Sequence, residues 1–562
     1  MSSSSSSSCV TTHGPGGSSS TSCAEECASE KPVEYGTGRL LLAPVHLRHG
    51  AYNQDWLVRP FYNNLYPNDP GSGEPDYVGM LGHGWAMDLL GHVIRIENGA
   101  KLLYYSLKGT ILFEWVPVAG RYLPLPRKPG LSLVHESGAA EYQIGLPNGQ
   151  IELFHDHTVT PTELRGQKKG FLDAGRHRWV VARDLANRTL TISACERIGS
   201  FVVCKELKGT PVFQFVTLPI DGKERIVAGN FYIWTEGAAN PKQFIAKVDY
   251  EYYLAEETDK GLAGDLKRVT ILRCTANCSS ESPTWAPWLR TYYRYYTSTS
   301  SIGMPHGLKY VLEPEGYHRM SDPQLGNLNP LTATDAQLAP YADYYLEYDS
   351  SKRVTKERRH GTGTGSLTST FSYTARVGGS DGFNEWKMKT VETRPDGTTM
   401  TVYTNYLAQV ILRDHQSGTQ RWYEYNLYDT LGQLVQKALP SAVASYTQGS
   451  TSPQNLTVTL NTSAGLIHDQ EYYGDTDPVS PGHLKTVRIK QGSGGSLVKL
   501  RAYEYEVWDD GTLIYLPRYL VKKETLYLSA TDDTKTAVTN YAHDFHANST
   551  QVSRKTTTLP AV

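Results

Sequence analysis

Apolar and polar side chains alternate with a period of two along much of this chain. The segment FIAKVDYEY (244–252) puts Phe, Ala, Val and Tyr on one face and mostly charged residues on the other, and AYEYEVW (502–508) alternates Tyr and Val with Glu. This period predicts half-buried antiparallel strands. Between such segments lie Asx-Gly dipeptides, which tolerate the positive φ angles of two-residue hairpin turns. They are Asn98-Gly99, Asn148-Gly149, Asp221-Gly222, Asp381-Gly382, Asp396-Gly397 and Asp510-Gly511.

The composition agrees with an all-β fold. The chain has 38 Tyr but only 12 Phe among its 562 residues, and Tyr suits strands that are apolar at the ring and wet at the hydroxyl. Fifty Gly and 30 Pro supply many turns, so we expect little helix. The formal net charge of -2 gives no electrostatic basis for binding nucleic acid or an anionic membrane. No run of about 18 apolar residues occurs, so we expect no membrane-spanning helix.

The sequence divides into four regions. Residues 1–34 are rich in Ser and Gly, and we expect this tract to be disordered because it cannot bury enough apolar surface. It has neither the basic start nor the apolar core of a secretory signal. Residues 35–330 form an N-terminal β-rich region, residues 331–345 a short helical connector, and residues 346–562 a degenerate repeat region. Within the connector, we expect Thr334 to cap a helix that runs to about Tyr344.

The seven cysteines leave several states open. Cys23/Cys27 and Cys274/Cys278 each have three intervening residues, which is within zinc-ligand spacing. Cys195 and Cys204 are spaced like two positions on a hairpin. We favour disulfides or plain thiols over a structural metal. The spacing does not assign a redox compartment. Cys9 is the remaining cysteine.

A loose repeat begins near residue 341. Each unit has Tyr-x-Tyr, an acidic residue, a turn, an aliphatic pair and a basic residue. The copies are YLEYDSSKRVTKE (345–357), YEYNLYDTLGQLVQKALPSA (423–442), EYYGDTDPVSPGHLKTVRIKQ (471–491), YEYEVWDDGTLIYLPRYLVKKE (503–524) and NYAHDFHANSTQVSRKTTTLPA (540–561). In the clearest copy, we expect Tyr423, Tyr425 and Leu427 to share a strand face. The turn then spans residues 429–432, and the return strand begins at Leu434.

The clearest copy resembles the repeat of the RHS/YD-repeat family (RHS, rearrangement hot spot), whose core is roughly Tyr-Asp, two residues, Gly-Arg-Leu. Tyr428, Asp429, Gly432 and Leu434 match this core, and Gln433 stands where arginine is usual. The N-terminal region resembles the module that precedes such repeats. The matching features are Arg59, Tyr62, Asn63, Gly82, Gly84, Trp85 and the segments GTILFEW (109–115), PNGQIELF (147–154) and HGLKYVLEPEGY (306–317). The resemblance covers most of residues 35–562.

This resemblance implies a large β-shell wound from a spiralling antiparallel sheet, with this chain forming the preceding β-domain and part of the shell. In toxin-bearing bacterial members, the shell encloses a C-terminal toxin domain, which a self-cleaving aspartyl site with paired Asp-Pro-x-x-Gly motifs releases. Neither that pair nor a variable C-terminal domain is found in this sequence. We therefore expect either part of a longer protein or a member without cargo. The resemblance also implies a secreted or cell-surface location, with an enclosed C-terminal polypeptide or a surface carbohydrate as partner.

Each candidate site has a structural interpretation beside the functional one. His83 in the segment GHGW could face a ligand, but its two glycine neighbours and Trp85 favour a tight bend with a packed indole. Tyr428-Asp429 could bind a sugar, but a pair that recurs along the chain favours cross-strand packing and turn formation. We prefer the structural interpretation for both.

The charged clusters favour structural roles as well. WDDG (508–511) and AEETD (255–259) supply carboxylates, but a glycosidase needs two that oppose each other across a cleft, and neighbours on a strand point apart. We expect turns or solvent-facing charge there, and a solvated loop at the basic run KERRHGTG (356–363). Signatures of hydrolases, zinc proteases, phosphate-binding loops and EF-hands do not occur. The sequence therefore assigns no catalytic, cofactor-binding or metal-binding residue.

The preferred hypothesis is a non-enzymatic RHS/YD-type scaffold with an encapsulating or cell-surface role, which needs no cofactor. One alternative is a carbohydrate-binding surface protein that stacks exposed Tyr and Trp on sugar rings. A less favoured alternative is a glycosidase-like β-enzyme.

Overall fold

The computed structural model describes residues 33–43, 47–51, 54–58, 60–63, 80–87, 90–96, 99–106, 109–160, 164–173, 178–184, 186–198, 201–204, 211–234, 241–257, 259–360, 366–477, 480–508, 517–546 and 551–560. The Ser/Gly-rich tract at residues 1–34, for which disorder was expected, lies almost wholly outside the described residues. The same holds for Cys9, Cys23, Cys27, Arg59, Asp509 and Asp510.

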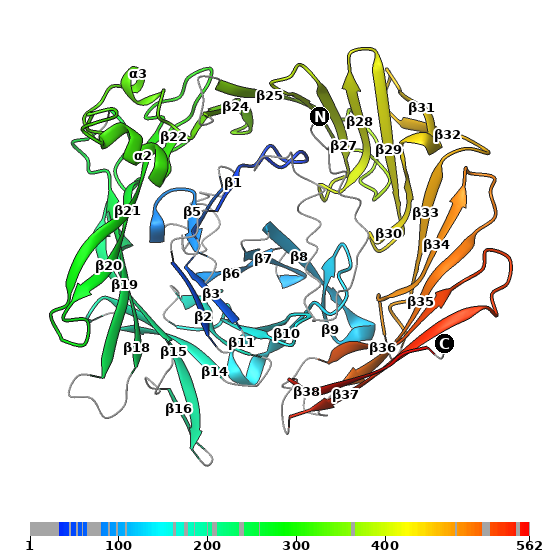
Figure 1. The fold of residues 1–562 in the computed structure, drawn as a ribbon, viewed down its shortest axis with the longest axis horizontal. Coiled ribbons are helices and arrows are strands. Elements are labelled where there is room, and N and C mark those ends of the chain that lie inside the picture. Colours follow the sequence, from blue (N-terminus) through cyan, green and yellow to red (C-terminus); the bar gives the residue numbers. More distant parts are fainter. Residues whose placement is uncertain are drawn as a thin grey trace.

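Most described strands belong to one antiparallel sheet that follows the order of the chain (Figure 1). Its first strands are β6 His92–Ile96, β7 Lys101–Ser106, β8 Gly109–Val116, β9 Arg121–Leu125, β10 Ser132–Glu136, β11 Glu141–Gly145, β12 Ile151–His155, β13 Lys168–Leu172, β14 Arg178–Asp184, β15 Thr189–Ile198, β16 Phe201–Cys204, β17 Pro211–Ile220, β18 Lys223–Trp234, β19 Lys242–Tyr252, β20 Leu266–Ala276, β21 Thr284–Tyr295 and β22 Leu308–Leu312. It continues with β23 Tyr344–Tyr348, β24 Val354–His360, β25 Ser366–Ala375, β26 Met388–Thr393, β27 Thr399–Thr404, β28 Val410–Ser417, β29 Gln420–Tyr428, β30 Leu434–Ala438, β33 Leu466–Tyr472, β34 Leu484–Gln491, β35 Val498–Trp508, β36 Arg518–Tyr527, β37 Thr536–Phe545 and β38 Val552–Thr558.

Consecutive strands of this sheet are joined mainly by hairpins. The exceptions are that β15 pairs with both β16 and β17, and that β30 pairs with β33 because β31 Val443–Gln448 and β32 Leu456–Leu460 form a separate hairpin. Long sheets of this kind twist and curl, and this one curls into a ring (Figure 1). The expected all-β fold of antiparallel hairpins in a β-shell is confirmed.

The N-terminal strands lie inside the ring (Figure 1). Strands β1 Leu41–Leu42, β4 Pro60–Asn63 and β5 Trp85–Met87 form a small sheet, and β2 Leu47–Ala51 pairs with β3 Gln54–Val58. We refer to residues 33–43, 60–63 and 80–87 as the inner segment. Most of its buried hydrophobic side chains, including Tyr35 and Trp85, share one hydrophobic core with ring residues from Phe171 to Val410, whereas Phe61 packs in a separate cluster.

Polar contacts also attach the inner segment to the ring. The Tyr35 hydroxyl donates to Glu392 Oε2 at 2.7 Å, and the Val354 amide donates to the Gly38 carbonyl at 3.0 Å. The Trp85 indole donates to the Tyr295 hydroxyl at 2.9 Å. The inner segment is therefore held by directional bonds as well as by apolar burial.

A recurrent five-residue turn joins several hairpins of the repeat region. At Asp429, the side chain accepts from the amides of residues 431 and 433 at 2.9 Å, and Gly432 has a φ of 75°. The same contacts recur at Asp349 and at Asn405, where Lys352 and Ala408 take the left-handed position at 64° and 60°. A register shift precedes each turn, as expected when a left-handed residue closes a type I turn. The first YD copy thus makes its turn without a glycine.

The excess of Tyr over Phe has a structural explanation in a ladder of hydroxyl bonds. In six pairs of adjacent strands, a Tyr hydroxyl donates to the carbonyl of the first residue of the neighbouring strand, at 2.6–3.0 Å. The pairs are Tyr295–Leu266, Tyr348–Leu308, Tyr373–Val354, Tyr428–Val410, Tyr472–Leu434 and Tyr505–Leu484. Each ring packs in the sheet while its hydroxyl satisfies a backbone acceptor, which Phe cannot do.

The helical connector differs in part from the prediction. Thr334 caps α3 Asp335–Leu338 through a capping box with Gln337, as expected at its start. The helix ends at Leu338 rather than near Tyr344, because Pro340 follows and Tyr344 begins β23. Helix α2 Pro314–Ser321, which begins with a proline in its first turn, was not predicted from the sequence. Short 3-10 turns occupy Pro117–Ala119, Ser137–Ala139 and Pro440–Ala442. In the described part of the chain, no helix has the length and apolarity needed to cross a bilayer.

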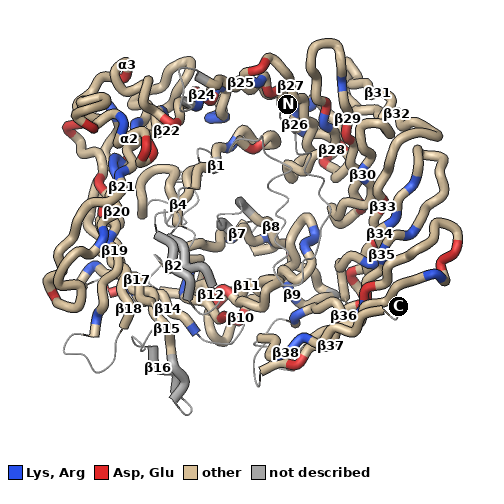
Figure 2. The backbone as a smooth tube through the Cα atoms, in the orientation of Figure 1, with Lys and Arg blue, Asp and Glu red and all other residues tan. Residues whose placement is uncertain are grey.

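Charges of both signs are interspersed over the ring strands (Figure 2). Many form cross-strand ion pairs, such as Lys485 with Glu471 at 2.8 Å and Lys523 with Glu504 at 2.7 Å. Exposed pairs of this type contribute little each, about 0–1 kcal/mol, and the core carries most of the stability.

Candidate functional site

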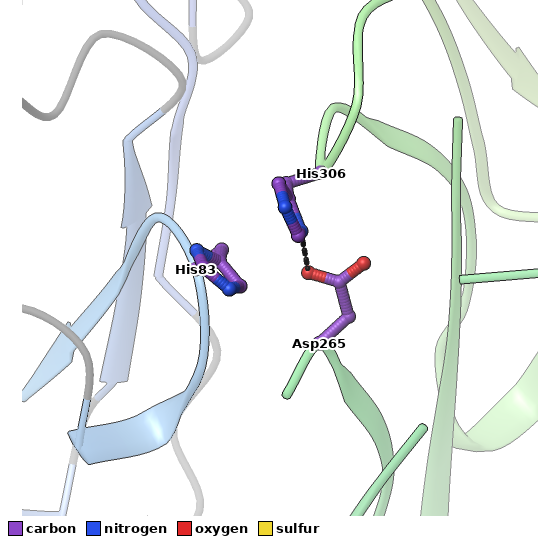
Figure 3. A group of neighbouring side chains, drawn as sticks. All are labelled: His83, Asp265 and His306. Atoms are coloured by element: carbon purple, nitrogen blue, oxygen red, sulfur yellow. Dashed lines mark hydrogen bonds and ion pairs between the residues drawn. The ribbon is translucent and has the colours of Figure 1, made fainter. Parts of the chain in front are cut away.

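Two histidines and one aspartate from distant parts of the chain meet where the inner segment touches the ring. They are His83, Asp265 and His306, and one ring nitrogen or carboxylate oxygen from each lies within 4.8 Å of the others. Figure 3 shows the two imidazoles facing each other with Asp265 beside His306. His83 and Asp265 are 182 positions apart in the sequence, and Asp265 and His306 are 41 positions apart.

A glycine bend places His83 at this contact. Gly82 and Gly84 have φ angles of 103° and 75°, and the Trp85 amide donates back to the Gly82 carbonyl at 3.2 Å. A Cβ on Gly82 would lie 2.9 Å from both the Gly264 carbonyl oxygen and the Leu266 amide nitrogen. Because only glycine permits this approach, the bend fits directly against the β19–β20 turn.

Two successive hairpin turns of the ring supply the other members of the cluster. Asp265 directly precedes β20, and His306 lies in the β21–β22 connection with a φ of 64°. The Tyr62 hydroxyl accepts from the Leu308 amide at 3.0 Å and donates to the His306 carbonyl at 3.2 Å. The inner segment therefore fixes the backbone around His306 as well as supplying His83.

The β17–β18 turn brings a second carboxylate close to the cluster. Asp221 and Gly222 both have positive φ, and they join Ile220 directly to Lys223, as the Asp-Gly signal predicted. Asp221 Oδ2 lies 3.7 Å from His83 Nε2 and accepts from the guanidinium of buried Arg225 at 2.9 Å. Three neighbouring hairpin turns thus face one bend of the inner segment.

Asp265 is the most buried member, with no exposed surface. Its Oδ1 contacts His306 Nδ1 at 2.9 Å, and its Oδ2 accepts from the Leu262 amide at 2.9 Å. Burial raises the pKa of this carboxyl above its usual value, against the opposing effect of the His306 bond. The imidazoles of His83 and His306 stack at 3.7 Å between centroids, with side-chain exposures of 17% and 28%. The site is therefore closed on the carboxylate side and open to solvent on the imidazole side.

This set of groups suits metal binding or proton-linked contacts better than nucleophilic catalysis. Neutral imidazole and carboxylate are the ligands that Zn²⁺, Ni²⁺ and Cu²⁺ favour. The described residues of the cluster contribute no serine or cysteine nucleophile. The tight bend expected at GHGW is present, and Trp85 is fully buried. His83 of this bend also belongs to the cluster.

The Tyr428-Asp429 pair has the structural role that was expected for it. Its strand and turn have the predicted limits: β29 ends at Tyr428 and β30 begins at Leu434. The Tyr428 hydroxyl donates to the Val410 carbonyl at 2.7 Å, and one Asp429 oxygen binds the turn amides. The Tyr428 hydroxyl and one Asp429 oxygen are thus bonded to the backbone of the sheet.

The expected solvated loop at KERRHGTG is wrong for its first residues. Lys356 to His360 lie in β24, Glu357 has no exposed surface, and Arg359 donates to the Tyr344 hydroxyl at 2.6 Å. In AEETD, the Glu257 amide donates to the Leu254 carbonyl at 3.0 Å and closes a turn, in line with the expected turn.

The cysteines that the structure describes favour disulfides. Cys274 and Cys278 are bonded, which corrects the alternative of a metal ligand pair. Cys195 is disulfide-bonded and lies opposite Cys204 in the register of β15 and β16, at the hairpin spacing expected for them.

Among the comparisons with known proteins, only the search of solved structures gives matches, and these have low similarity. No protein-family model matches the sequence, and no curated protein gives a significant match. A Tc holotoxin pore from Photorhabdus luminescens with a substitution in TccC3 matches at 10% identity and a TM-score of 0.31, over 93% of this chain and 28% of that chain. TcdB2-TccC3 without its hypervariable C-terminal region matches at 8% identity and a TM-score of 0.32, over 93% of this chain and 36% of that chain. The chain thus spans well under half the length of the structures it matches.

Proposed function

We propose that this protein is a non-enzymatic scaffold of the RHS/YD-repeat type, whose curled sheet forms part of a shell around a polypeptide. The observation that carries the proposal is the ring of antiparallel hairpins with the chain's own inner segment bound inside it (Figure 1). A sheet that binds 33–43 and 80–87 through both apolar burial and hydrogen bonds has an inner face suited to holding chain.

The repeat units support this assignment. The turns at Asp349, Asn405 and Asp429 share the same side-chain to backbone bonds and the same left-handed residue three positions later. The Tyr-Asp pairs of the sequence resemblance therefore correspond to one structural device. Its repetition extends the sheet, which is the property a shell needs.

A toxin-delivery shell is the narrower form of this proposal. The resemblance to toxin-bearing RHS/YD members supports it, and the enclosed partner would be a C-terminal polypeptide. A carbohydrate-binding role draws less support, because the Tyr428 hydroxyl and one Asp429 oxygen are already bonded to the backbone of the sheet.

Protease protection tests the proposal. An unstructured, protease-sensitive reporter is fused after Val562, and a matched control carries the same reporter in the β28–β29 turn at Gly418, where a Cβ would meet nothing within 4 Å. We expect the C-terminal reporter to be cleaved more slowly than the turn reporter in the native protein, and equally fast after unfolding in urea. Equal cleavage rates in the native protein would contradict an enclosing role, and a glycan array with specific, Tyr428-dependent binding would favour the carbohydrate alternative.

A further inference from the structure

We propose that His83, Asp265 and His306 bind a divalent transition-metal ion of the Zn²⁺ class, which clamps the inner segment to the ring. The three ligand atoms already lie within 4.8 Å of one another (Figure 3). Ligands at 2.0–2.2 Å from a tetrahedral Zn²⁺ are roughly 3.4 Å apart, so metal binding requires the stacked imidazoles to rotate until a nitrogen of each ring points at the same ion. The proposal does not rest on the shell function.

The donor types select the metal. Two imidazoles and one carboxylate match Zn²⁺, Ni²⁺ or Cu²⁺, whereas Ca²⁺ and Mg²⁺ prefer sets made of oxygen atoms. The solvent-exposed side of the two imidazoles leaves room for water as a fourth ligand. The site is therefore a three-ligand centre with one open position.

The backbone holds the ligands in advance of binding. Asp265 Oδ2 is occupied by the Leu262 amide, which directs Oδ1 toward His306. His306 is held in its left-handed conformation next to a carbonyl bonded by Tyr62, and Gly82 fixes the bend before His83. A site whose ligands lie on tight turns loses little conformational freedom on binding, which favours affinity.

The surrounding charges fit a cation at the three ligands. Asp265 is a fully buried carboxylate, and a bound cation would offset the cost of that burial. Asp221 Oδ2 lies 3.7 Å from His83 Nε2, which is too long for a direct hydrogen bond, but its negative charge beside the imidazole favours a bound cation. The Arg225 guanidinium is paired with Asp221 at 2.9 Å, which offsets part of its charge, and it also acts electrostatically on Asp265.

The consequence is a metal-dependent attachment between two parts of the chain. His83 belongs to the inner segment, whereas Asp265 and His306 belong to the ring, at turns separated by β20 and β21. A shared ion would add a bond that disappears with chelation. The inner segment would then open more readily without unfolding of the ring.

Metal titration of the purified, chelator-treated protein tests this inference. We expect the wild type to bind one equivalent of Zn²⁺ more than either His306→Asn or His83→Asn. Asn tolerates the positive φ of residue 306 and can still donate to Asp265, so the first variant removes the ligand with little strain. His318→Gln is the matched control, because this histidine is 65% exposed on α2, and it is expected to retain the equivalent.

Two further measurements separate this site from the cysteines and from misfolding. Co²⁺ bound to His and Asp gives a tetrahedral or five-coordinate visible spectrum without a thiolate charge-transfer band, and that spectrum is lost in His306→Asn. Zn²⁺ at about 100 times its Kd lowers the unfolding equilibrium constant about 100-fold in the wild type, and slows hydrogen exchange in residues 80–87. Absence of Zn²⁺ uptake by the wild type, or equal uptake by wild type and both ligand variants, would overturn the inference.

Discussion

Replacing Tyr295 by Phe removes one oxygen atom that joins the inner segment to the ring. This hydroxyl accepts from the Trp85 indole and donates to the Leu266 carbonyl, both at 2.9 Å, and the side chain is only 2% exposed. The substitution leaves a buried donor and a buried acceptor without this partner. Each such group costs about 1–3 kcal/mol, so we expect a loss of about 2–6 kcal/mol. That is a large part of the total stability of a typical domain, about 5–15 kcal/mol.

Tyr293 supplies the matched control on the same strand. It is fully buried, yet among the described residues its hydroxyl has no hydrogen-bond partner. Tyr293→Phe keeps the ring that packs against Trp85 at 4.9 Å and removes an unsatisfied polar atom. We expect it to be neutral or stabilising by about 1 kcal/mol.

Equilibrium urea unfolding of both variants, followed by tryptophan fluorescence, measures the difference. The reasoning is refuted if Tyr295→Phe unfolds at the wild-type midpoint, or if Tyr293→Phe is as destabilised as Tyr295→Phe. The second outcome would mean that ring polarity or packing, and not the hydroxyl bonds, determines the cost.

Three other predictions follow from single contacts. Burial lowers the pKa of His157 to about 4, so the unfolded state binds the extra proton between about pH 6.5 and 4. The free energy of unfolding should therefore fall by up to about 3 kcal/mol as pH drops through that window, and His157→Gln should flatten the profile; an unchanged profile would be contrary to this assignment. Gly82→Ala should cost more than about 2 kcal/mol in urea unfolding because its Cβ meets ring backbone at 2.9 Å, whereas Gly397→Ala, with nothing within 4 Å, should cost only about 1 kcal/mol; equal costs would argue against the close approach. Asp429→Ala should lower the free energy of unfolding by about 1–2 kcal/mol through the loss of two turn bonds, and a neutral result would remove the turn role of the YD pair.

The period-two pattern predicted strands, and the Asx-Gly dipeptides predicted turns in part, since Asp381-Gly382 lies in the long connection between β25 and β26 rather than in a two-residue hairpin turn. Asp221-Gly222 forms the expected two-residue turn, and the hairpin around Asp429 has the predicted limits, because both depend on residues close together in the chain. The high Tyr content indicated strands. It did not indicate which backbone carbonyls accept the Tyr hydroxyls, because the strand register determines those pairs. Register depends on bulges that the sequence does not reveal.

The cluster around His83 could not be predicted for a similar reason. His83, Asp265 and His306 meet only because the sheet curls round the inner segment and brings turns of separate hairpins to one place. One signal was available: His83, Asp265 and His306 each neighbour a glycine, at positions where the backbone turns sharply. The helix α2 had a readable start in Pro314, but the preceding β22 sequence favoured continued strand.

The central claim is that the antiparallel sheet forms a ring around the chain's own inner segment. A single-particle cryo-EM map of the purified chain tests it most directly. We predict a curled sheet with density on its inner side for the indole of Trp85 next to Tyr295 and for the backbone of Gly38 next to Val354. A flat or extended sheet, or a ring whose inner side lacks this segment, would contradict the account.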